Sequence, residues 1–317
     1  MLDAELAAIV SSLPKYDLGN VPACRRIDAE FAAEAEQHGG AHAGTGRVIW
    51  RDQMVLSSPS AARVLVRVYR PAGLGTHAPG LLFLHGGAFC LGDLDTAHQR
   101  CLRFAEATEC LVVNVDYRLA PEHPFPAGLN DCWAVLQWMA KGAGEFSLDP
   151  TRLAVGGSSA GGALAAALAL RARDQGGPDL VFQLLLFPVT DHRMMTASIA
   201  SCTSTPVWDT QGCKWMWRHY LGRTPNEGQH RAVSPYAAPA LADKRGLPPA
   251  YILTAEFDPL RDEGIEYGLS LLGAGVHTEI HQVPSAYHAF DVVAPASGIA
   301  QRAISEQIIA LRRALHG

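Results

Sequence analysis

The spacing of apolar residues changes near residue 46, and the two patterns predict different structures. The first part of the chain carries apolar side chains three or four residues apart, at Leu2, Leu6, Ile9, Val10 and Leu13. This spacing is typical of one face of a helix, which Pro14 would end. A second helix is predicted over residues 24–37, before a Gly/His/Ala-rich break at 38–46. We therefore expect residues 1–45 to form a helical cap segment.

From residue 46 onwards, short apolar runs alternate with longer helical stretches. Valine occupies every second position from 64 to 68, and the runs at 81–84 and 111–115 are largely apolar, as in parallel strands buried on both faces. Further strands are predicted at 152–155, 180–187, 250–255 and 278–283, and helices at 128–140, 160–173, 261–272 and 299–315. This alternation predicts an α/β fold whose mostly parallel central sheet is covered by helices on both faces.

Residues 189–247 interrupt the alternation. The stretch is rich in tryptophan and methionine, with Trp208, Trp215, Trp217, Met194, Met195 and Met216. An insertion of this length between strands favours a lid or a substrate-binding element, and a small satellite core is the alternative. Because no internal repeat or low-complexity linker is present, we expect one catalytic domain over 46–317 that carries this insertion.

Composition and charge exclude several classes of protein. The chain has 317 residues, of which 48% are hydrophobic and 18% charged, so it can bury a sizeable core. A net charge of −5 and scattered Lys and Arg argue against nucleic-acid binding. The first residues are acidic, and no stretch reaches 18 apolar residues, which predicts neither a signal peptide nor a membrane span. Seven cysteines without a C-x-x-C pair favour reduced thiols and a cytoplasmic protein.

The run Val-Gly-Gly-Ser-Ser-Ala-Gly-Gly at 155–162 lies between a predicted strand and a predicted helix. Within it, only Ser159 has glycine two positions before and two after, at Gly157 and Gly161. On a strand-to-helix turn this pattern forms a nucleophile elbow, and the glycines let the turn pack closely against its neighbours. We predict Ser159 as the nucleophile, with the adjacent Ser158 as its rival.

A second glycine-rich segment, His85-Gly86-Gly87-Ala88-Phe89, follows the predicted strand at 81–84. It is close to the H-G-G-G pattern of lipases and esterases, whose backbone N–H groups bind an oxyanion. We expect the N–H groups of Gly86, Gly87 and Ala160 to be the donors. The alternatives are an ordinary turn or a metal at His85. Neither an H-E-x-x-H motif nor a Cys/His spacing supports a metal, so none is expected.

The acid and the base are predicted from their places after two strands. Asp258 follows the strand at 250–255, at the carboxyl end where such a sheet gathers its functional groups. Its rivals are Glu256, which is closer to the strand, and Asp262, which a helix dipole would favour in any case. His288 lies between the last strand and the last helix, where a base can reach Ser159.

Thirteen histidines make the choice of base depend on context. His277 and His281 lie in a β-like stretch and are expected to be structural. Without the upstream elbow and acid, His288 would itself be interpreted as a solvated loop residue.

Longer segments surround these candidate residues. They read H-G-G-A-F at 85–89, D-Y-R-L-A-P-E-H-P-F-P-A at 116–127, G-G-S-S-A-G-G at 156–162, D-P-L-R-D-E-G at 258–264 and Y-H-A-F at 287–290. Together they resemble the hormone-sensitive-lipase family of α/β-hydrolases, in which nucleophile, acid and histidine follow in this order. The resemblance covers essentially everything from residue 47 on, and the N-terminal helices are similar in kind to that family's cap. It implies an α/β-hydrolase fold and a carboxylesterase for short or medium acyl esters, without a cofactor.

Two positions depart from the family pattern. Ala88 stands where a third glycine is usual, and its methyl group is expected to narrow the oxyanion loop or the acyl pocket. Ser158 stands where the family often has an acid. Within the 116–127 segment, Arg118 and Glu122 are expected to form a structural ion pair beneath the site.

The sequence thus predicts a serine carboxylesterase for small-molecule esters, with Ser159, His288 and Asp258 as its triad. An amidase or a lactonase would use the same triad. A non-catalytic ligand receptor on a hydrolase scaffold is the alternative from another class, although such a receptor would be expected to lack a triad member. Acyl and alcohol specificity are not readable from the sequence. A homodimer through an edge strand or the last helix is left open.

Overall fold

The computed structural model describes residues 1–37, 46–56, 63–222 and 232–317. These residues contain an eight-stranded sheet in the order β1-β2-β4-β3-β5-β6-β7-β8. The strands are β1 Val48–Leu56, β2 Arg63–Pro71, β3 Ala78–Leu84, β4 Leu111–Asp116, β5 Leu148–Ser158, β6 Phe182–Leu186, β7 Ala250–Phe257 and β8 Thr278–Tyr287. Strand β2 is antiparallel to both β1 and β4, and the strands from β4 to β8 are parallel to one another. The predicted α/β fold with a mostly parallel sheet is confirmed.

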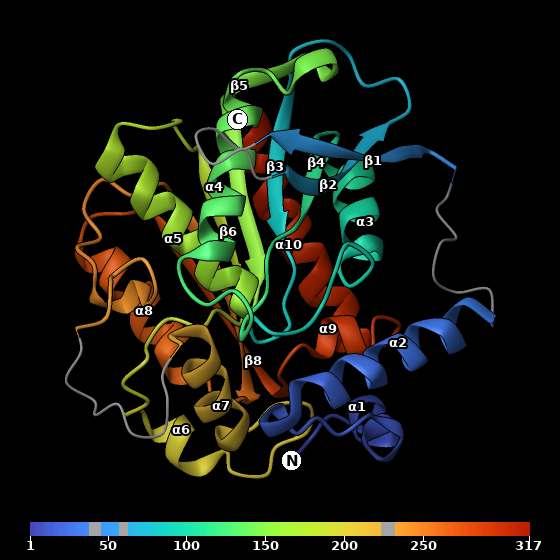
Figure 1. The fold of residues 1–317 in the computed structure, drawn as a ribbon, viewed down its shortest axis with the longest axis vertical. Helices are drawn as coiled ribbons and strands as arrows, with labels where there is room; N and C mark the ends of the chain where they lie inside the picture. The colour runs from blue at the N-terminus through green and yellow to red at the C-terminus, as the bar shows by residue number, and fades with distance from the viewer. Residues whose placement is uncertain (38–45, 57–62, 223–231) are drawn as a thin grey trace.

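Helices cover both faces of the sheet (Figure 1). The helices are α1 Ala4–Ile9, α2 Val21–Gln37, α3 His98–Thr108, α4 Ala127–Ala140, α5 Ala160–Gln175, α6 Ala197–Ser201, α7 Thr210–Tyr220, α8 Arg261–Gly273, α9 Phe290–Val293 and α10 Gly298–His316. Helices α3 and α10 share one hydrophobic core with the sheet, whereas α4, α5 and α8 share the other.

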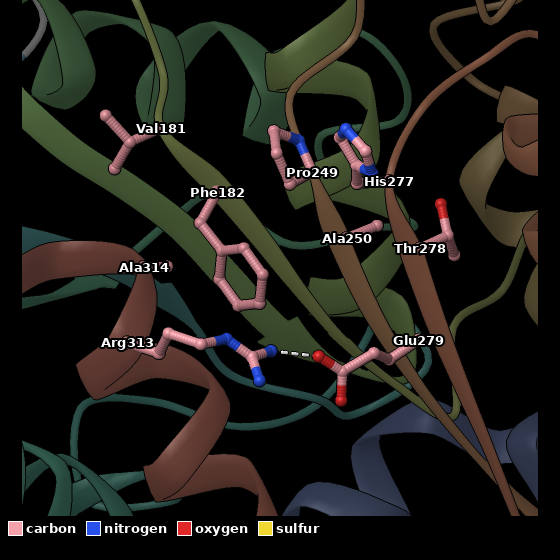
Figure 2. Close-up of a pocket in the computed structure, with 9 residues that line it drawn as sticks. All are labelled: Val181, Phe182, Pro249, Ala250, His277, Thr278, Glu279, Arg313 and Ala314. Carbon is pink, nitrogen blue, oxygen red and sulfur yellow. Dashed lines mark hydrogen bonds and ion pairs between the residues drawn. The ribbon is translucent and has the colours of Figure 1, made fainter. Parts of the chain in front are cut away.

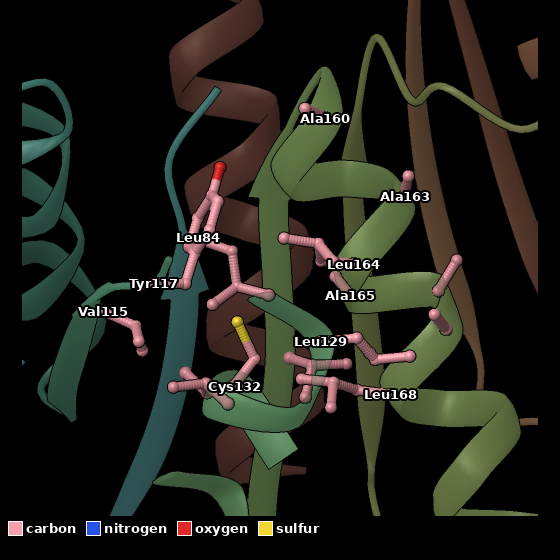
Figure 3. Packing of buried hydrophobic residues seen from close by; sticks show 14 of the residues in the cluster. Leu84, Val115, Tyr117, Leu129, Cys132, Ala160, Ala163, Leu164, Ala165 and Leu168 are labelled. Atoms are coloured by element: carbon pink, nitrogen blue, oxygen red, sulfur yellow. The ribbon is translucent and has the colours of Figure 1, made fainter. Parts of the chain in front are cut away.

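Alternation along the central strands explains the continuous apolar runs in the sequence. In β3, Leu81 and Phe83 belong to the core under α3 and α10, while Leu82 and Leu84 belong to the core under α4 and α5. Because both faces of such a strand are covered, no polar position interrupts the pattern. Figure 3 shows Leu84 close to side chains of α4 and α5 on one side of the sheet.

Several elements were not predicted, namely β1, α3, α9 and the helices α6 and α7 of the insertion. For β1 and α3 the signal is weak. Strand β1 is an edge strand that pairs only with β2, and its residues are mostly exposed, so it lacks the apolar run of a buried strand. Helix α3 is short and opens on His-Gln-Arg, although Cys101, Ala105 and Thr108 are buried at helical spacing. The predicted helices near the N-terminus exist with shifted bounds. The first continues as a 3₁₀ turn over Val10–Ser12, and the second begins at Val21.

The N-terminal helices and the insertion lie together beyond the carboxyl ends of the parallel strands. Figure 1 shows α1, α2, α6 and α7 at this end of the molecule, away from the C-terminus. The ring of His219 on α7 forms a hydrogen bond with the carbonyl of Leu18, at 2.8 Å, so the two segments contact each other. All seven cysteines are buried and unpaired. Within the described ranges, no helix has both the length and the apolar character needed to cross a membrane.

Candidate active site

Strand register brings the predicted acid and histidine together. Phe257 at the end of β7 pairs with Tyr287 at the end of β8. The next residues, Asp258 and His288, therefore leave the sheet side by side, although 30 positions separate them. No helical or local spacing in the sequence encodes this proximity. It follows from the parallel pairing of two strands that happen to end at the same level.

A continuous chain of hydrogen bonds joins Asp258, His288 and Ser159. His288 Nδ1 lies 2.6 Å from Asp258 Oδ2, and His288 Nε2 lies 3.1 Å from Ser159 Oγ. The other carboxylate oxygen of Asp258 accepts the N–H of Leu260 at 2.9 Å. The side chains of Asp258, His288 and Ser159 are all buried. A carboxylate at Nδ1 holds the proton on that nitrogen, which leaves the Nε2 lone pair facing the serine hydroxyl.

Ser159 occupies a strained turn between β5 and α5. Its φ of 56° and ψ of −116° lie outside the regions that non-glycine residues usually adopt, at a cost of about 1–3 kcal/mol. The turn is supported locally, since the Ser159 N–H donates to the Leu186 carbonyl at 2.7 Å. Glycine is required on both sides. A Cβ on Gly157 would lie 2.3 Å from the backbone of Gly161, and one on Gly161 would lie 2.1 Å from Leu84 O.

The predicted oxyanion loop passes directly over this turn. Leu84 pairs with Gly157 across β3 and β5, so the residues after β3 emerge beside the serine. A Cβ on Gly86 would lie 3.1 Å from Ser158 O, and one on Gly87 would lie 2.2 Å from Leu91 O. Glycine thus occupies two positions of this loop at which a side chain would crowd a neighbouring backbone atom.

The third expected donor comes from the start of a helix. Ala160 is the first residue of α5, so its N–H has no acceptor within the helix. The N-terminal end of a helix also carries a partial positive charge, which favours an anion beside Ser159.

Ala88, which replaces the third glycine of the family pattern, lies at a position whose backbone conformation favours glycine. Ala88 and Phe89 have φ values of 55° and 59°, in the left-handed region that favours glycine. The usual glycine of the family would adopt this backbone freely, whereas alanine does so at a cost of about 1–2 kcal/mol. The methyl group of Ala88 is buried in the hydrophobic core cluster.

His85 supports the oxyanion loop from inside. Its ring is fully buried and stacked on Tyr117, with ring centroids 4.3 Å apart. Its Nδ1 donates to Gly86 O at 2.7 Å, because a carbonyl can only accept. Burial lowers the pKa of His85 to about 4. The ring is therefore neutral near pH 7. No group of three or more His, Cys, Asp or Glu that could hold a metal occurs in the part of the chain that the structure describes.

The rival acids hold other parts of the structure. Glu256 Oε2 accepts the N–H of Ser285 at 2.6 Å, which steadies the strand that leads to His288. Asp262 Oδ2 accepts the N–H of Ser198 at 2.7 Å, at the start of α6. Ser158 is the last residue of β5 and pairs with Leu186 across β6, and the histidine bond goes to its neighbour Ser159.

The histidines expected to be structural lie on or beside β8, away from the triad. His281 lies between two carboxylates, 3.3 Å from Glu279 and 3.2 Å from Glu306. His277 lines a cleft of about 520 Å³ at the amino ends of β6, β7 and β8, shown in Figure 2. An ion pair between Glu279 and Arg313 borders this cleft. The cleft and the triad lie at opposite ends of the parallel strands.

The expected ion pair between Arg118 and Glu122 is wrong. Arg118 instead forms a two-pronged bond with Asp131 of α4, each prong 2.8 Å long. Glu122 pairs with Arg25 of α2 at 2.8 Å. Asp131 is buried beside Arg118 and takes its guanidinium, while Glu122 is half exposed and faces the cap. The prediction paired two residues that are close in the sequence, whereas the actual partners are brought together only by the fold.

Sequence reasoning missed Glu263, which is buried and interacts electrostatically with Asp258 of the triad. Its Oε1 accepts the N–H groups of Thr190 and Asp191 at 2.6 and 3.2 Å. Burial raises the pKa of this carboxyl to about 8. Glu263 therefore fixes the first residues of the insertion to α8. Glu263 belongs to the D-P-L-R-D-E-G segment and lies in the first turn of α8. This position was the only signal in the sequence that could have pointed to it.

Aromatic side chains surround His288. The ring of Phe187, at the end of β6, lies 5.5 Å from the imidazole, and that of Trp208, within the insertion, lies 6.2 Å away. The interpretation of the insertion as a substrate-binding element is compatible with this placement.

Comparisons with known proteins agree with the fold and with an esterase. A family model described as the alpha/beta hydrolase fold matches residues 81–292. The chain therefore belongs to the alpha/beta hydrolase family. Esterase LipI of Mycobacterium tuberculosis is 41% identical over 259 residues, which cover 81% of this chain and 80% of that protein. Carboxylesterase NlhH of the same organism is 42% identical over 254 residues, or 79% and 78% of the two chains.

Solved structures of similar sequence share the whole architecture. The structure described as a bacterial heroin esterase has a TM-score of 0.94 at 39% identity, and the match covers 100% of this chain and 98% of that one. Esterase LipW from Mycobacterium marinum has a TM-score of 0.89 at 39% identity, with coverage of 100% and 96%. The similarity thus includes the N-terminal helices as well as the sheet.

Proposed function

We propose that this protein is a serine carboxylesterase that hydrolyses short- to medium-chain acyl esters through an acyl-enzyme intermediate. The observation that carries the proposal is the hydrogen-bonded chain from Asp258 through His288 to Ser159, set in a strained turn beneath a glycine-rich loop. The names of its relatives, esterase LipI and carboxylesterase NlhH, support the same chemistry.

The geometry accounts for each step of ester hydrolysis. Ser159 Oγ attacks the ester carbonyl carbon while its proton passes to His288 Nε2, and Asp258 stabilises the imidazolium. The carbonyl oxygen becomes an oxyanion, which accepts hydrogen bonds from the N–H groups of Gly86, Gly87 and Ala160. When the carbonyl re-forms, the alcohol leaves with the proton from Nε2. Water then attacks the acyl-enzyme in the same way, giving the carboxylic acid and restoring Ser159.

The surroundings of the triad favour apolar substrates. Phe187 and Trp208 place aromatic rings beside His288. Phe89 of the oxyanion loop is stacked on Tyr220 of α7, with ring centroids 3.6 Å apart. Aromatic side chains beside a few fixed polar groups are typical of sites for small apolar ligands. An uncharged acyl chain suits this environment better than an ionic one.

The proposal is tested with p-nitrophenyl esters of increasing acyl length, from acetate to palmitate. We expect kcat/KM to be highest for short to medium acyl chains and to fall for long ones. An amidase or lactonase would instead prefer an anilide or a lactone of matched acyl group. Failure to turn over any ester, with turnover of an anilide or lactone, would contradict the esterase assignment.

We further propose that the protein acts in the cytoplasm, as a homodimer. Seven buried, unpaired cysteines suit a reducing compartment. Strand β8 is an edge of the sheet, and Glu306 of α10 pairs with His281 of this strand, so a dimer contact through β8 would also involve α10. Sedimentation equilibrium at micromolar concentration measures the oligomeric state.

A further inference from the structure

Among the described side chains of helix α2, that of Arg25 forms a hydrogen bond with the oxyanion loop. Its Nε donates to the carbonyl of Cys90 at 2.9 Å, and its Nη2 donates to the carbonyl of Ala120 at 3.1 Å. The same guanidinium forms a two-pronged bond with Glu122, Nη1 to Oε1 at 2.9 Å and Nη2 to Oε2 at 2.8 Å. One residue of the cap thus holds two backbone segments of the catalytic domain.

Both carbonyls belong to segments that shape the loop. The N–H of Cys90 donates to Gly87 O at 2.9 Å, which closes the turn that begins at Gly87. The N–H of Ala120 donates to Phe89 O at 2.8 Å, which ties the same turn to its neighbour. Arg25 therefore bonds to Ala120, one partner in this pairing, and to Cys90, the residue after the other partner.

The turn needs such support because its backbone is strained. Gly87, Ala88 and Phe89 follow one another with φ values of 118°, 55° and 59°. Two of these three residues are not glycine, and each pays a conformational cost that persists only when the surroundings impose it. A turn of this kind relaxes when an external contact is removed. The N–H groups of Gly86 and Gly87 would then lose their direction.

We infer that Arg25 is a positioning residue of the esterase reaction, which holds the carbonyls of Cys90 and Ala120 so that the N–H groups of Gly86 and Gly87 point at the oxyanion. This inference rests on the proposed function. It makes the N-terminal helix a part of the transition-state machinery rather than only a cover over the substrate.

The chemistry of the contact requires arginine. A planar guanidinium presents several N–H donors in fixed directions, so it can bond two carbonyls and a carboxylate at once. A lysine ammonium can keep the charge pair with Glu122, but it cannot hold all three groups in this geometry. The pair itself is partly exposed, and such pairs contribute little to stability alone. The positioning role of Arg25 therefore depends on its hydrogen bonds to the carbonyls of Cys90 and Ala120.

A second contact between the cap and the catalytic domain supplies a matched control. The N–H of Gly298, at the start of α10, donates to Glu5 Oε2 of α1 at 2.8 Å. Glu5→Ala removes this bond and loosens the N-terminal segment away from the oxyanion loop. If Arg25 acted only by keeping the cap attached, the two sites would give similar kinetic effects.

The test compares wild type with Arg25→Met, Arg25→Lys, Glu122→Gln and Glu5→Ala on a p-nitrophenyl ester. Active sites are counted by titration with a fluorophosphonate, so that kcat refers to folded protein. The second readout is the inhibition constant of a trifluoromethyl ketone. Ser159 Oγ adds to its carbonyl, the serine proton moves to His288, and the resulting oxyanion occupies the same position as in the reaction.

We expect Arg25→Met to lower kcat by about tenfold or more with KM within about twofold, because donors to the oxyanion act mainly in the transition state. The inhibition constant of the ketone should rise by the same factor by which kcat/KM falls. Arg25→Lys should be intermediate. Glu122→Gln should keep most activity, because the bonds to both carbonyls remain, and Glu5→Ala should match wild type.

Three results would overturn the inference. They are a kcat within twofold of wild type for folded Arg25→Met, an equal loss in Glu5→Ala, or a fall in kcat that leaves the ketone affinity unchanged. If Arg25→Met does not fold, the Arg25→Lys variant tests the inference instead. Wild-type kinetics in Arg25→Lys would then contradict it. Wild type without ester turnover would instead overturn the proposed function and the inference together, which distinguishes the two failures.

Discussion

The turn at Ser159 and the loop at 85–91 lie at the ends of neighbouring parallel strands, and both contain left-handed backbone, but they are supported differently. The serine turn is held by what lies next to it in the sheet, through the bond from Ser159 N–H to Leu186 O and the close packing of Gly157 and Gly161. The oxyanion loop has support from inside through His85, but it is also held from outside, by Arg25 of α2 and by the stacking of Phe89 on Tyr220 of α7.

This difference separates two ways of stabilising a strained backbone. A turn supported by its own strand and helix moves only if the sheet moves. A loop supported by two cap elements depends on the position of those elements, so a displaced cap would disturb the oxyanion loop. The turn that carries Ser159 does not depend on the cap in this way, because its contacts are made within the sheet and with α5.

The largest effect is expected from the nucleophile itself. Ser159→Ala should lower kcat for p-nitrophenyl butyrate by roughly 10⁴-fold or more, because no other hydroxyl is held against His288 Nε2 in the described structure. Ser158→Ala, one residue earlier, should keep kcat within a few-fold of wild type. Initial rates with titrated enzyme measure both. Loss of activity in the Ser158 variant with survival in the Ser159 variant would reverse the assignment.

Two glycine substitutions probe the two kinds of support. Gly161→Ala puts a methyl group 2.1 Å from Leu84 O, inside the sheet, and should cost about 3 kcal/mol or more of unfolding free energy. Gly87→Ala meets Leu91 O at 2.2 Å in a loop that can shift, so it should cost less stability while lowering kcat strongly. Urea unfolding and kinetics on the same samples compare them.

Gly273→Ala, which meets nothing within 4 Å, is the control for these substitutions. It should leave both stability and kcat near the wild-type values. A greater loss of stability in Gly87→Ala than in Gly161→Ala would contradict the contrast between local and external support.

The fold and the triad were predictable where the signal is local, and the supports were not. Strands β3 and β4 are buried on both faces, and their apolar runs stand out, whereas the exposed edge strand β1 has no such pattern. Ser159 and its glycines lie within a few residues of one another, so a short motif captures them. Arg25 and Glu122 are 97 residues apart, and Thr190 and Glu263 are 73 apart. Such pairs are set by the approach of whole elements, and no spacing reveals them.

A pH dependence of stability follows from His85 beneath the loop. Its pKa in the folded protein, about 4, lies below the ordinary value of 6.5. Folding therefore favours the neutral ring, and this contribution is fully present above pH 6.5 and is lost as the pH falls towards 4. Within that window the unfolding free energy should fall by up to about 1.4 kcal/mol per pH unit from this group.

His85→Gln removes this titration while leaving the other groups in place. The unfolding free energy of the variant should be lower at pH 7 but should change less between pH 7 and pH 4.5. Urea titrations at four pH values measure both proteins. Parallel curves for variant and wild type would show that His85 does not contribute.

The smallest effect is expected at Ala88. Ala88→Gly relieves the left-handed conformation, but it also frees the unfolded chain and removes a buried methyl group, and each effect is about 1 kcal/mol. The unfolding free energy should therefore change by less than about 1 kcal/mol, with kcat near wild type. A loss above about 2 kcal/mol would indicate that the methyl group, rather than the backbone, determines this position.

Labelling with a fluorophosphonate tests the central claim most directly, because only a serine activated by its histidine reacts rapidly. Wild-type protein should lose ester turnover as one phosphonyl group is bound per chain, and mass spectrometry of the digested protein should place that group on Ser159. The Ser159→Ala and His288→Ala variants should remain unlabelled over the same time. Labelling of Ser158, or turnover that continues in protein labelled at Ser159, would contradict the account.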